Sequence, residues 1–200
     1  MMPILTKETK FIWIPDPLDG DYDIQVIGTD IEEYTLDFLS YTEVGEPTDA
    51  SFEGVISAEV TSNYTVDYNS VPGEITEIER VVTVKDAIED VKISYELGWI
   101  TKKFVKNIFI TKLKVAQRLE EQKEKQLKHF DELIEKAKNP AAKQKLEKAK
   151  EEYEETMNKV IIVVLNSFIK EVNFYAKKGY INDKAKTLLI DDASYLIEHL

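Results

Sequence analysis

Hydrophobic and polar residues change their spacing once along the chain. In the first part, apolar and polar positions alternate, as at Tyr22, Ile24 and Val26, which is typical of strands with one buried face. In the second part, apolar residues recur every three or four positions, which is typical of amphipathic helices. The pattern predicts a β domain over residues 1–85 and a helical domain over residues 86–200.

Short segments of the first part have strand character and are separated by turn signals such as Asp19-Gly20 and Pro72-Gly73. The strand candidates are Phe11–Ile14, Tyr22–Val26, Tyr34–Phe38, Phe52–Ile56, Tyr64–Tyr68 and Ile75–Val84. About six short strands at this spacing predict two packed antiparallel sheets, a small β-sandwich. The acidic residues between the apolar ones are expected on its outer face or in its loops.

Two copies of one short signal, Gly98-Trp99-Ile100-Thr101 and Gly179-Tyr180-Ile181-Asn182, enclose the longest helical stretch. In each copy a glycine ends one helix and a polar residue caps the next. Between them a single breaker, Asn139-Pro140, divides the stretch into two arms of nearly equal length. The pattern predicts an antiparallel helical hairpin with its tip near residues 139–140 and both glycine corners at its base.

Shorter helices are expected on either side of the hairpin. We expect one from Asp86, as its N-cap, to Leu97, and another from Asp183 to His199, capped by Asn182. Thr101 is expected to cap the first long helix, which reaches about Lys138. The base of the hairpin is richer in apolar residues than the tip, so the short helices should dock there.

The predicted fold class is therefore α+β with segregated domains. An N-terminal small antiparallel β-sandwich precedes a C-terminal four-helix unit of the order short, long, long, short. From that unit the antiparallel helical hairpin projects. Along the projection, charged residues occupy expected seam positions over Glu120–Gln126, so we expect the contact between its two helices to be weak there.

Charge is divided very unevenly between the two parts. The formal net charge is −12, of which residues 1–85 carry −14 and residues 86–200 carry +2. An acidic first part repels phosphate backbones, so nucleic-acid binding through it is not expected. The chain has no cysteine, which excludes disulfides, thiolate catalysis and thiolate-bound metals but does not fix the cellular compartment.

No apolar run approaches the roughly 20 residues that span a bilayer. The longest, Val160–Leu165, has six residues inside a longer helical pattern. The first residues, Met1–Lys7, lack the basic and apolar regions of a signal peptide. We therefore expect no membrane span, and no signal peptide in this chain.

The sequence offers no strong catalytic signal. The two histidines, His129 and His199, have no partner at the spacing of a metal site or a catalytic triad. Phosphate-binding loops and the sequence motifs of metalloproteases and serine hydrolases are absent from the sequence. Paired carboxylates carry little information among 38 acidic residues. We predict no catalytic, cofactor-binding or metal-binding residue, and no enzyme activity.

Two residue groups leave an alternative open. Asp16, Asp19, Asp21 and Asp23 offer oxygens for calcium, or form a solvated acidic strand edge that discourages edge-to-edge pairing; we favour the second interpretation. Trp99, Tyr180 and Phe168 could form an aromatic platform for a ligand. We favour a place in the core for these three, since aromatic residues dominate core energetics.

Several segments of the helical part match a known pattern. They are Leu97-Gly98-Trp99-Ile100, Leu113 with Ala116, Leu165-Asn166-Ser167-Phe168-Ile169-Lys170-Glu171-Val172, Gly179-Tyr180-Ile181 and Leu188-Leu189-Ile190-Asp191-Asp192-Ala193. Through them residues 91–200 resemble the FIMAH-type helical domain at the C-termini of bacterial and archaeal extracellular proteins. The hairpin between Arg118 and Lys159 is several turns longer than in that family. The resemblance implies an extracellular location and an accessory role.

The β part carries a second resemblance. Pro17–Thr29, followed by Tyr34-Thr35-Leu36-Asp37, is similar to a strand-turn-strand pattern of bacterial pre-peptidase C-terminal and related sandwich modules. The likeness covers roughly 50 residues and departs from that pattern at Ile31-Glu32-Glu33. Such modules are non-catalytic appendages of extracellular enzymes and adhesins.

Three functional hypotheses follow. The first is a non-catalytic extracellular or cell-surface accessory module that acts as a spacer, in adhesion or in binding a protein or surface polymer, and forms the C-terminal part of a longer secreted protein. The second is an intracellular, cytoplasmic protein that interacts or oligomerises through the coiled-coil arm. The third is a carboxylate-dependent hydrolase in the sandwich. The oligomeric state is left open, and we favour the first hypothesis.

Overall fold

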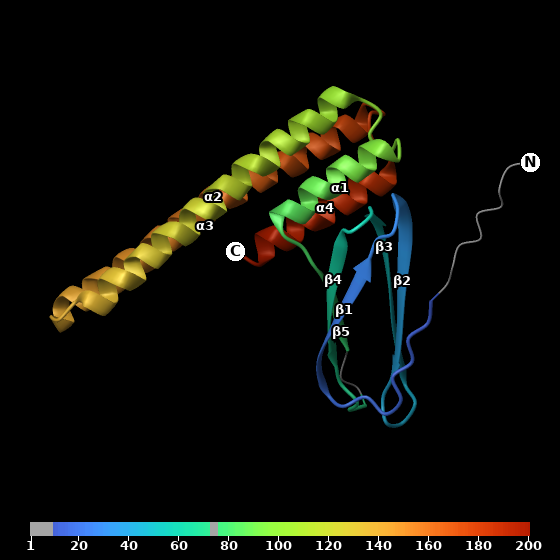
Figure 1. The fold of residues 1–200 in the computed structure, drawn as a ribbon, viewed down its shortest axis with the longest axis horizontal. Helices are drawn as coiled ribbons and strands as arrows, with labels where there is room; N and C mark the ends of the chain where they lie inside the picture. Colours follow the sequence, from blue (N-terminus) through green and yellow to red (C-terminus); the bar gives the residue numbers. More distant parts are fainter. Residues whose placement is uncertain (1–9, 73–75) are drawn as a thin grey trace, which may run out of the picture.

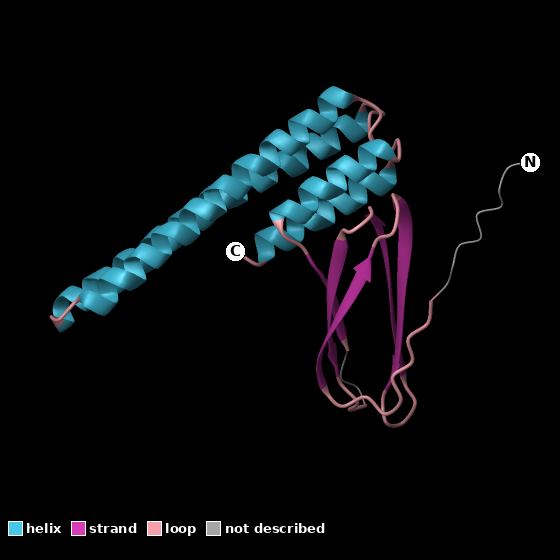
Figure 2. Ribbon diagram, in the orientation of Figure 1, coloured by secondary structure: helices cyan, strands magenta, loops and turns pink. Residues whose placement is uncertain are grey.

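Strands and helices occupy separate parts of the protein, as the change in spacing predicts (Figures 1 and 2). This computed structural model describes residues 10–72 and 76–200. Its elements are β1 (Gly20–Ile27), β2 (Glu32–Tyr41), β3 (Pro47–Ile56), β4 (Thr61–Tyr68), β5 (Glu77–Val81), α1 (Val84–Glu96), α2 (Lys103–Lys136), α3 (Pro140–Lys177) and α4 (Asp183–Glu198). The predicted α+β class, a sandwich followed by four helices with a projecting hairpin, is confirmed.

The strands form two small antiparallel sheets. One has the order β1-β4-β5 and the other is the β2-β3 hairpin. Burial alternates along β1 and β4, because successive side chains point to opposite faces of a sheet. Between the sheets, the hydroxyl groups of Tyr34 and Tyr64 lie 2.7 Å apart, and the rings of Phe52 and Tyr64 meet edge to face at 5.2 Å. Aromatic side chains therefore join the two sheets.

Gly54 on β3 makes room for this aromatic contact. A Cβ atom at position 54 would lie 2.5 Å from the end of the Tyr34 ring, which is well inside van der Waals contact. Glycine at this position lets the Tyr34 ring cross the hairpin and reach Tyr64. The close approach explains why a strand interior contains a residue with low strand propensity.

Two predicted strands differ in the structure. Phe11–Ile14 is not a strand, and its first three side chains are at least 80% exposed. Four consecutive apolar residues have no alternating face, and no described strand pairs with them. The last strand is Glu77–Val81 rather than Ile75–Val84, because Thr83 already caps the first helix. Ile75 lies outside the described residues.

Two predicted helix caps also need correction. Thr83, not Asp86, is the N-cap of α1, and Asp86 completes a capping box by accepting a hydrogen bond from the Thr83 N–H. Lys102, not Thr101, precedes α2, without a side-chain cap. The Thr101 hydroxyl instead donates to the carbonyl oxygen of Tyr180 at 3.2 Å. The contact between the two corners thus replaces the cap.

The caps at the other two helices are as predicted. The side chain of Asn139 accepts a hydrogen bond from the Ala141 N–H, and Pro140 is the first residue of α3. The side chain of Asn182 accepts from the Ala185 N–H at the start of α4. The turn at Asn139-Pro140 places the tip of the hairpin where the sequence predicted it.

The two glycine corners meet at the base of the hairpin, also as predicted. Ile100 and Ile181 form an antiparallel bridge. The Thr101 N–H donates to Tyr180 O at 2.9 Å, and the Asn182 N–H donates to Trp99 O at 3.0 Å. Each corner turns because its glycine has a positive φ, 76° at Gly98 and 70° at Gly179. The backbone itself therefore holds the ends of α1, α2, α3 and α4 together.

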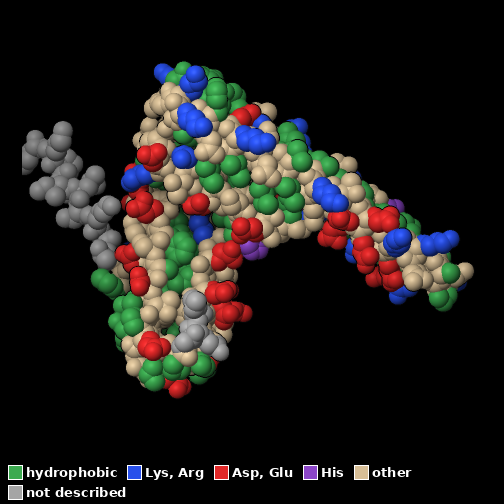
Figure 3. All heavy atoms as spheres, turned by 180° about the vertical axis from the view of Figure 1, so that it is seen from behind, with side chains coloured by type: hydrophobic (Ala, Val, Ile, Leu, Met, Phe, Trp, Pro, Cys, Tyr) green, Lys and Arg blue, Asp and Glu red, His purple; other side chains and the backbone are tan. Residues whose placement is uncertain are grey.

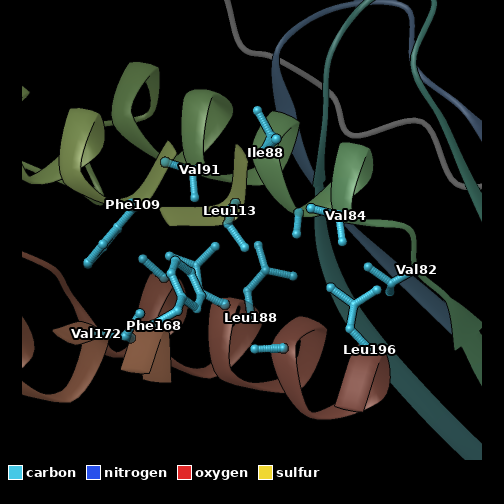
Figure 4. Packing of buried hydrophobic residues seen from close by; sticks show 14 of the residues in the cluster. Val82, Val84, Ile88, Val91, Phe109, Leu113, Phe168, Val172, Leu188 and Leu196 are labelled. Carbon is cyan, nitrogen blue, oxygen red and sulfur yellow. The ribbon is translucent and has the colours of Figure 1, made fainter. Parts of the chain in front are cut away.

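One apolar cluster fills the helical unit and extends into the sandwich. Side chains of α1 and α4 point toward those of α2 and α3, and Val82 lies beside Leu196 at the edge of the cluster (Figure 4). Val55 of β3 belongs to the same cluster. The two parts therefore share a continuous apolar contact.

The core does not extend along the arm. The buried residues of α2 all lie before residue 117, and those of α3 all lie after residue 160. Beyond them the two helices meet through a narrow seam, such as Phe130 with Tyr153, whose ring centroids are 6.0 Å apart. Lys150 and Asp131 add an ion pair of 2.5 Å across the seam. None of the described helices is long and apolar enough to cross a membrane.

Candidate functional site

The most unusual site in the protein is a buried ion cluster between the sandwich and the helices. Arg80 lies on β5, Asp90 on α1 and Asp192 on α4. One guanidinium nitrogen of Arg80 lies 2.7 Å from Asp90 Oδ2, and the other lies 2.7 Å from Asp192 Oδ1. The two carboxylates are buried almost completely, and the Arg80 side chain is 13% exposed. A single arginine therefore binds two helices to the last strand.

Burial dominates the protonation of this cluster. It raises the pKa of Asp192 well above its ordinary value, and the negative charge of Asp90 raises it further. Burial also raises the pKa of Asp90, where the attraction of Arg80 opposes it. For Arg80, burial opposes the charged form, but the two carboxylates outweigh it and raise its pKa. We infer that Arg80 stays charged and that Asp192 is the carboxyl group that most readily holds a proton.

The cluster is not completely satisfied by hydrogen bonds. Within the described part of the chain, Arg80 Nε and Asp192 Oδ2 are buried without a partner. A proton on Asp192 reduces the excess of negative charge around one arginine, which lowers the cost of burying two carboxylates. The phenol of Tyr64 lies nearby, and its pKa is raised by burial and by the adjacent Tyr34.

Further contacts join the sandwich to the helical unit at the two ends of α4. Trp99 Nε1, at the first glycine corner, donates to Glu33 on β2 at 3.1 Å. Lys184 at the start of α4 pairs with the same carboxylate, and its ammonium lies over the Trp99 ring at 5.4 Å from the centroid. At the other end of α4, His199 Nε2 lies 3.5 Å from Glu79 on β5. The helical unit is thus held to the sandwich at both ends of α4.

Two surface hollows lie apart from the buried carboxyls of the Arg80 cluster. Asp90 and Asp192, the two carboxyls with the deepest burial, lie in the packed junction and line neither of the two hollows that we describe. The hollow beside the sandwich, of about 480 Å³, lies between β3 and β5 and is lined by other acidic residues, including Asp49 and Glu79. The raised pKa values of Asp90 and Asp192 therefore belong to groups outside both hollows.

The acidic segment near β1 does not form a compact set of ligands. Asp21 and Asp23 occupy exposed positions on β1, and the carboxylate of Asp19 accepts a hydrogen bond from the Ser70 N–H at 2.8 Å. Across residues 10–72 and 76–200, no three Asp, Glu or His side chains are grouped in a way that could hold a metal ion. Asp16 belongs to none of the ion pairs described above.

The three aromatic candidates pack in or against the apolar cluster, and the two histidines lie outside it. Phe168 is fully buried and Trp99 is 8% exposed, both in the apolar cluster, and Tyr180 packs against it. This places the three aromatic residues in the core, the interpretation that we favoured. His129 is exposed on the arm, whereas the His199 ring stacks on Tyr195 with a centroid distance of 3.9 Å.

Sequence reasoning missed the Arg80 cluster, although a signal was present. Asp90 follows Ala87 by three residues and precedes Ser94 by four, so it lies on the buried face of α1. Asp192 lies four residues after Leu188 and four before Leu196, on the buried face of α4. A carboxylate inside each apolar stripe requires a cation, and Arg80 is one of only two arginines in the chain.

No known protein family, curated protein or solved structure matches this chain.

Proposed function

We propose that this protein is a non-catalytic accessory module that holds a long helical arm in a fixed position relative to a β-sandwich. It acts as a spacer or as a partner-binding part at the cell surface or outside the cell, within a longer secreted protein. The geometry supports the fixed arm. The resemblance of residues 91–200 and of the sandwich to extracellular modules supports the location.

The buried Arg80 cluster is the observation that carries this proposal. Two domains joined only by a linker would move independently, as is usual when the interface is small. Here the last strand ends at Val81 and α1 begins at Val84, so only two residues connect them. The cluster joins β5 to α1 and α4, and such buried polar groups fix one geometry better than an apolar contact does.

A distance measurement between spin labels tests whether the arm is fixed. The chain has no cysteine, so Thr35→Cys and Gln144→Cys introduce unique label sites on exposed positions of β2 and the arm. As a reference, Gln144→Cys with Asn166→Cys places both labels on α3, about 33 Å apart at 1.5 Å per residue. We expect the first distance distribution to be as narrow as the reference.

Other outcomes would contradict the proposal. A first distribution several times broader than the reference would show a flexible connection between the parts. A mass by light scattering of twice the chain mass, which falls to the monomer mass when residues 120–158 are deleted, would favour the oligomerisation hypothesis. Resistance of the chain to protease added to intact source cells, with digestion after lysis, would contradict the surface location.

A further inference from the structure

A groove lies between α2 and α3 near the base of the hairpin. It has a volume of about 550 Å³ and is lined by residues of these two helices alone. Its apolar lining comes from Ile108 and Val115 on α2 and from Val163 and Val164 on α3. Lys112 crosses it, binding Ser167 at 2.8 Å and Glu171 at 2.5 Å. Glu171, next to the groove on α3, is thereby paired with Lys112.

Large apolar side chains remain exposed along both sides of this groove. Val163 is 67% exposed and Val115 is 41% exposed. The α2 stripe runs through positions 104, 108, 111 and 115, and the α3 stripe through 160, 163, 167, 171 and 174, both at helical spacing. Phe104 and Phe174 lie closer to the base of the hairpin, where both rings contact Tyr175. Polar residues, Thr111, Ser167 and Glu171, interrupt the stripes, but the exposed valines and phenylalanines between them form an apolar surface of the kind that marks an interaction site.

The α2 side of this groove is basic. Residues 98–119 contain six Lys or Arg residues and no Asp or Glu. Lys and Arg side chains gather over this end of the helices, whereas acidic side chains follow the β part (Figure 3). Lys114, Arg118 and Lys170 are exposed, and none makes an ion pair within the described residues. These cations are therefore available to a partner.

The shape and charge of the groove select its occupant. A groove between two antiparallel helices fits the ridge of a third helix, whereas a planar lipid surface does not enter a concave groove. Two copies of this face would bring their unpaired cations together, which disfavours a symmetric dimer through it. The apolar floor requires an apolar stripe on the partner, and the basic rim requires acidic residues beside that stripe.

We propose that the groove between α2 and α3 binds an amphipathic helix of a partner protein whose apolar stripe is flanked by acidic residues. This inference rests on the proposed function as a partner-binding module, and it names the partner class. The fixed position of the arm is tested separately by the spin-label distances, so the two proposals can fail independently.

Binding of a synthetic peptide tests the groove. The probe is a fluorescent helical peptide of about five turns with leucines at i, i+3, i+4 and i+7 and glutamates on the flanks. A second peptide replaces the glutamates with lysines. We expect the full chain to bind the acidic peptide at least about tenfold more tightly than the basic one, a difference of about 1.4 kcal/mol, and more weakly as salt rises.

Matched variants locate the binding site. Val163→Glu places a charge in the groove, and Val44→Glu places the same charge at a residue with the same 67% exposure in the β part. We expect Val163→Glu and the double variant Lys114→Glu/Arg118→Glu to weaken binding at least about tenfold, with Val44→Glu unchanged. Circular dichroism and the melting temperature of each variant check that it is folded.

Four results would overturn the proposal. The first two are equal affinity for the two peptides and equal effects of Val163→Glu and Val44→Glu on binding. The third is tight binding to phosphatidylglycerol vesicles that Val163→Glu abolishes, with no peptide binding, which would assign the surface to an anionic membrane. The fourth is a concentration-dependent dimer mass that Val163→Glu abolishes, again with no peptide binding, which would assign the surface to a second copy of the chain.

Discussion

Arg80 Nη1 donates a hydrogen bond of 2.7 Å to Asp192 Oδ1, although the two residues lie 112 positions apart in the sequence. The contact joins the last strand of the sandwich to the last helix of the protein. Because both side chains are buried, it is not weakened by salt in the way that exposed ion pairs are. It therefore makes the packing of the two parts depend on one guanidinium group.

Replacing Arg80 with methionine should strongly destabilise the fold. The substitution keeps an apolar stem of similar length but leaves two buried carboxyls without their cation, which typically costs about 3–5 kcal/mol. Urea unfolding measures the change in the free energy of unfolding. Arg118→Met, at the other arginine, which is exposed, is the control and should change it by less than about 0.5 kcal/mol. Equal effects of the two substitutions would refute the role of the cluster.

The stability of the protein should depend on the protonation of Asp192. Folding raises the pKa of this carboxyl above 3.8, so the folded state keeps a proton that the unfolded chain releases. The contribution of this group to the free energy of unfolding is therefore largest at acidic pH. It decreases as the pH rises from about 4 toward the raised pKa of Asp192.

Asp192→Asn should remove this part of the pH dependence, since an amide has no proton to release and its oxygen can still accept from Arg80. Thermal melts between pH 4 and pH 9 should show that the variant gains stability relative to the wild type as the pH rises. Asp21→Asn, at an exposed position of β1, is the control and should show no such gain. If the difference in melting temperature between Asp192→Asn and the wild type did not change with pH, Asp192 would not be the source of the pH dependence.

Alanine at either glycine corner should destabilise the helical unit. Gly98 and Gly179 have φ angles of 76° and 70°, and nothing lies within 4 Å of a Cβ atom added at either. The cost is therefore conformational and not steric, about 1 kcal/mol for each substitution. Asparagine tolerates this conformation better, so Gly179→Asn should cost less than Gly179→Ala. Chemical unfolding of the three variants measures the order.

Gly54→Ala should separate the two sheets locally. Its Cβ atom would lie 2.5 Å from the Tyr34 hydroxyl oxygen, so the ring must move and lose its hydrogen bond to Tyr64. We expect a loss of about 1–3 kcal/mol, as is usual for overpacking. Tyr34→Phe removes the same hydrogen bond without a clash and should cost only about 1 kcal/mol. If Gly54→Ala and Tyr34→Phe lowered the free energy of unfolding equally, the close approach of Gly54 to the Tyr34 ring would not contribute to stability.

Removing the arm should leave the base folded. Replacing residues 124–156 with a short turn deletes no buried residue of α2 or α3, since these lie before residue 117 and after residue 160. The arm is held by narrow seam contacts and exposed ion pairs, which each contribute a few tenths of a kcal/mol. We expect a cooperative thermal transition within about 5 °C of the full chain. Loss of the transition would place part of the core in the arm.

Most of the fold could be predicted from local signals. Asn139-Pro140, Asn182 and the two glycines define the helix ends because each acts through backbone geometry within a few residues. Thr101 failed as a cap because its hydroxyl binds Tyr180, a partner 79 residues away. Phe11–Ile14 failed as a strand because composition alone cannot show whether a sheet edge is available to pair with it.

The candidate site was harder to predict than the fold. Asp90 and Asp192 each lie within the apolar stripe of their helix. The sequence of either helix alone is nevertheless that of an ordinary amphipathic helix. Only the meeting of α1 and α4 with Arg80 of β5 reveals why the carboxylates are there. The groove between α2 and α3 depends in the same way on the pairing of two helices, since its apolar stripes look like core positions in either helix alone.

The absence of buried α2 and α3 side chains beyond the base has a consequence for how the protein can evolve. Inserting or deleting matched heptads in both helices would change the reach of the tip by about 10 Å each time, while the junction and the groove would stay as they are. Reach and recognition can thus be selected separately, and relatives of this protein could differ greatly in arm length while keeping one binding face.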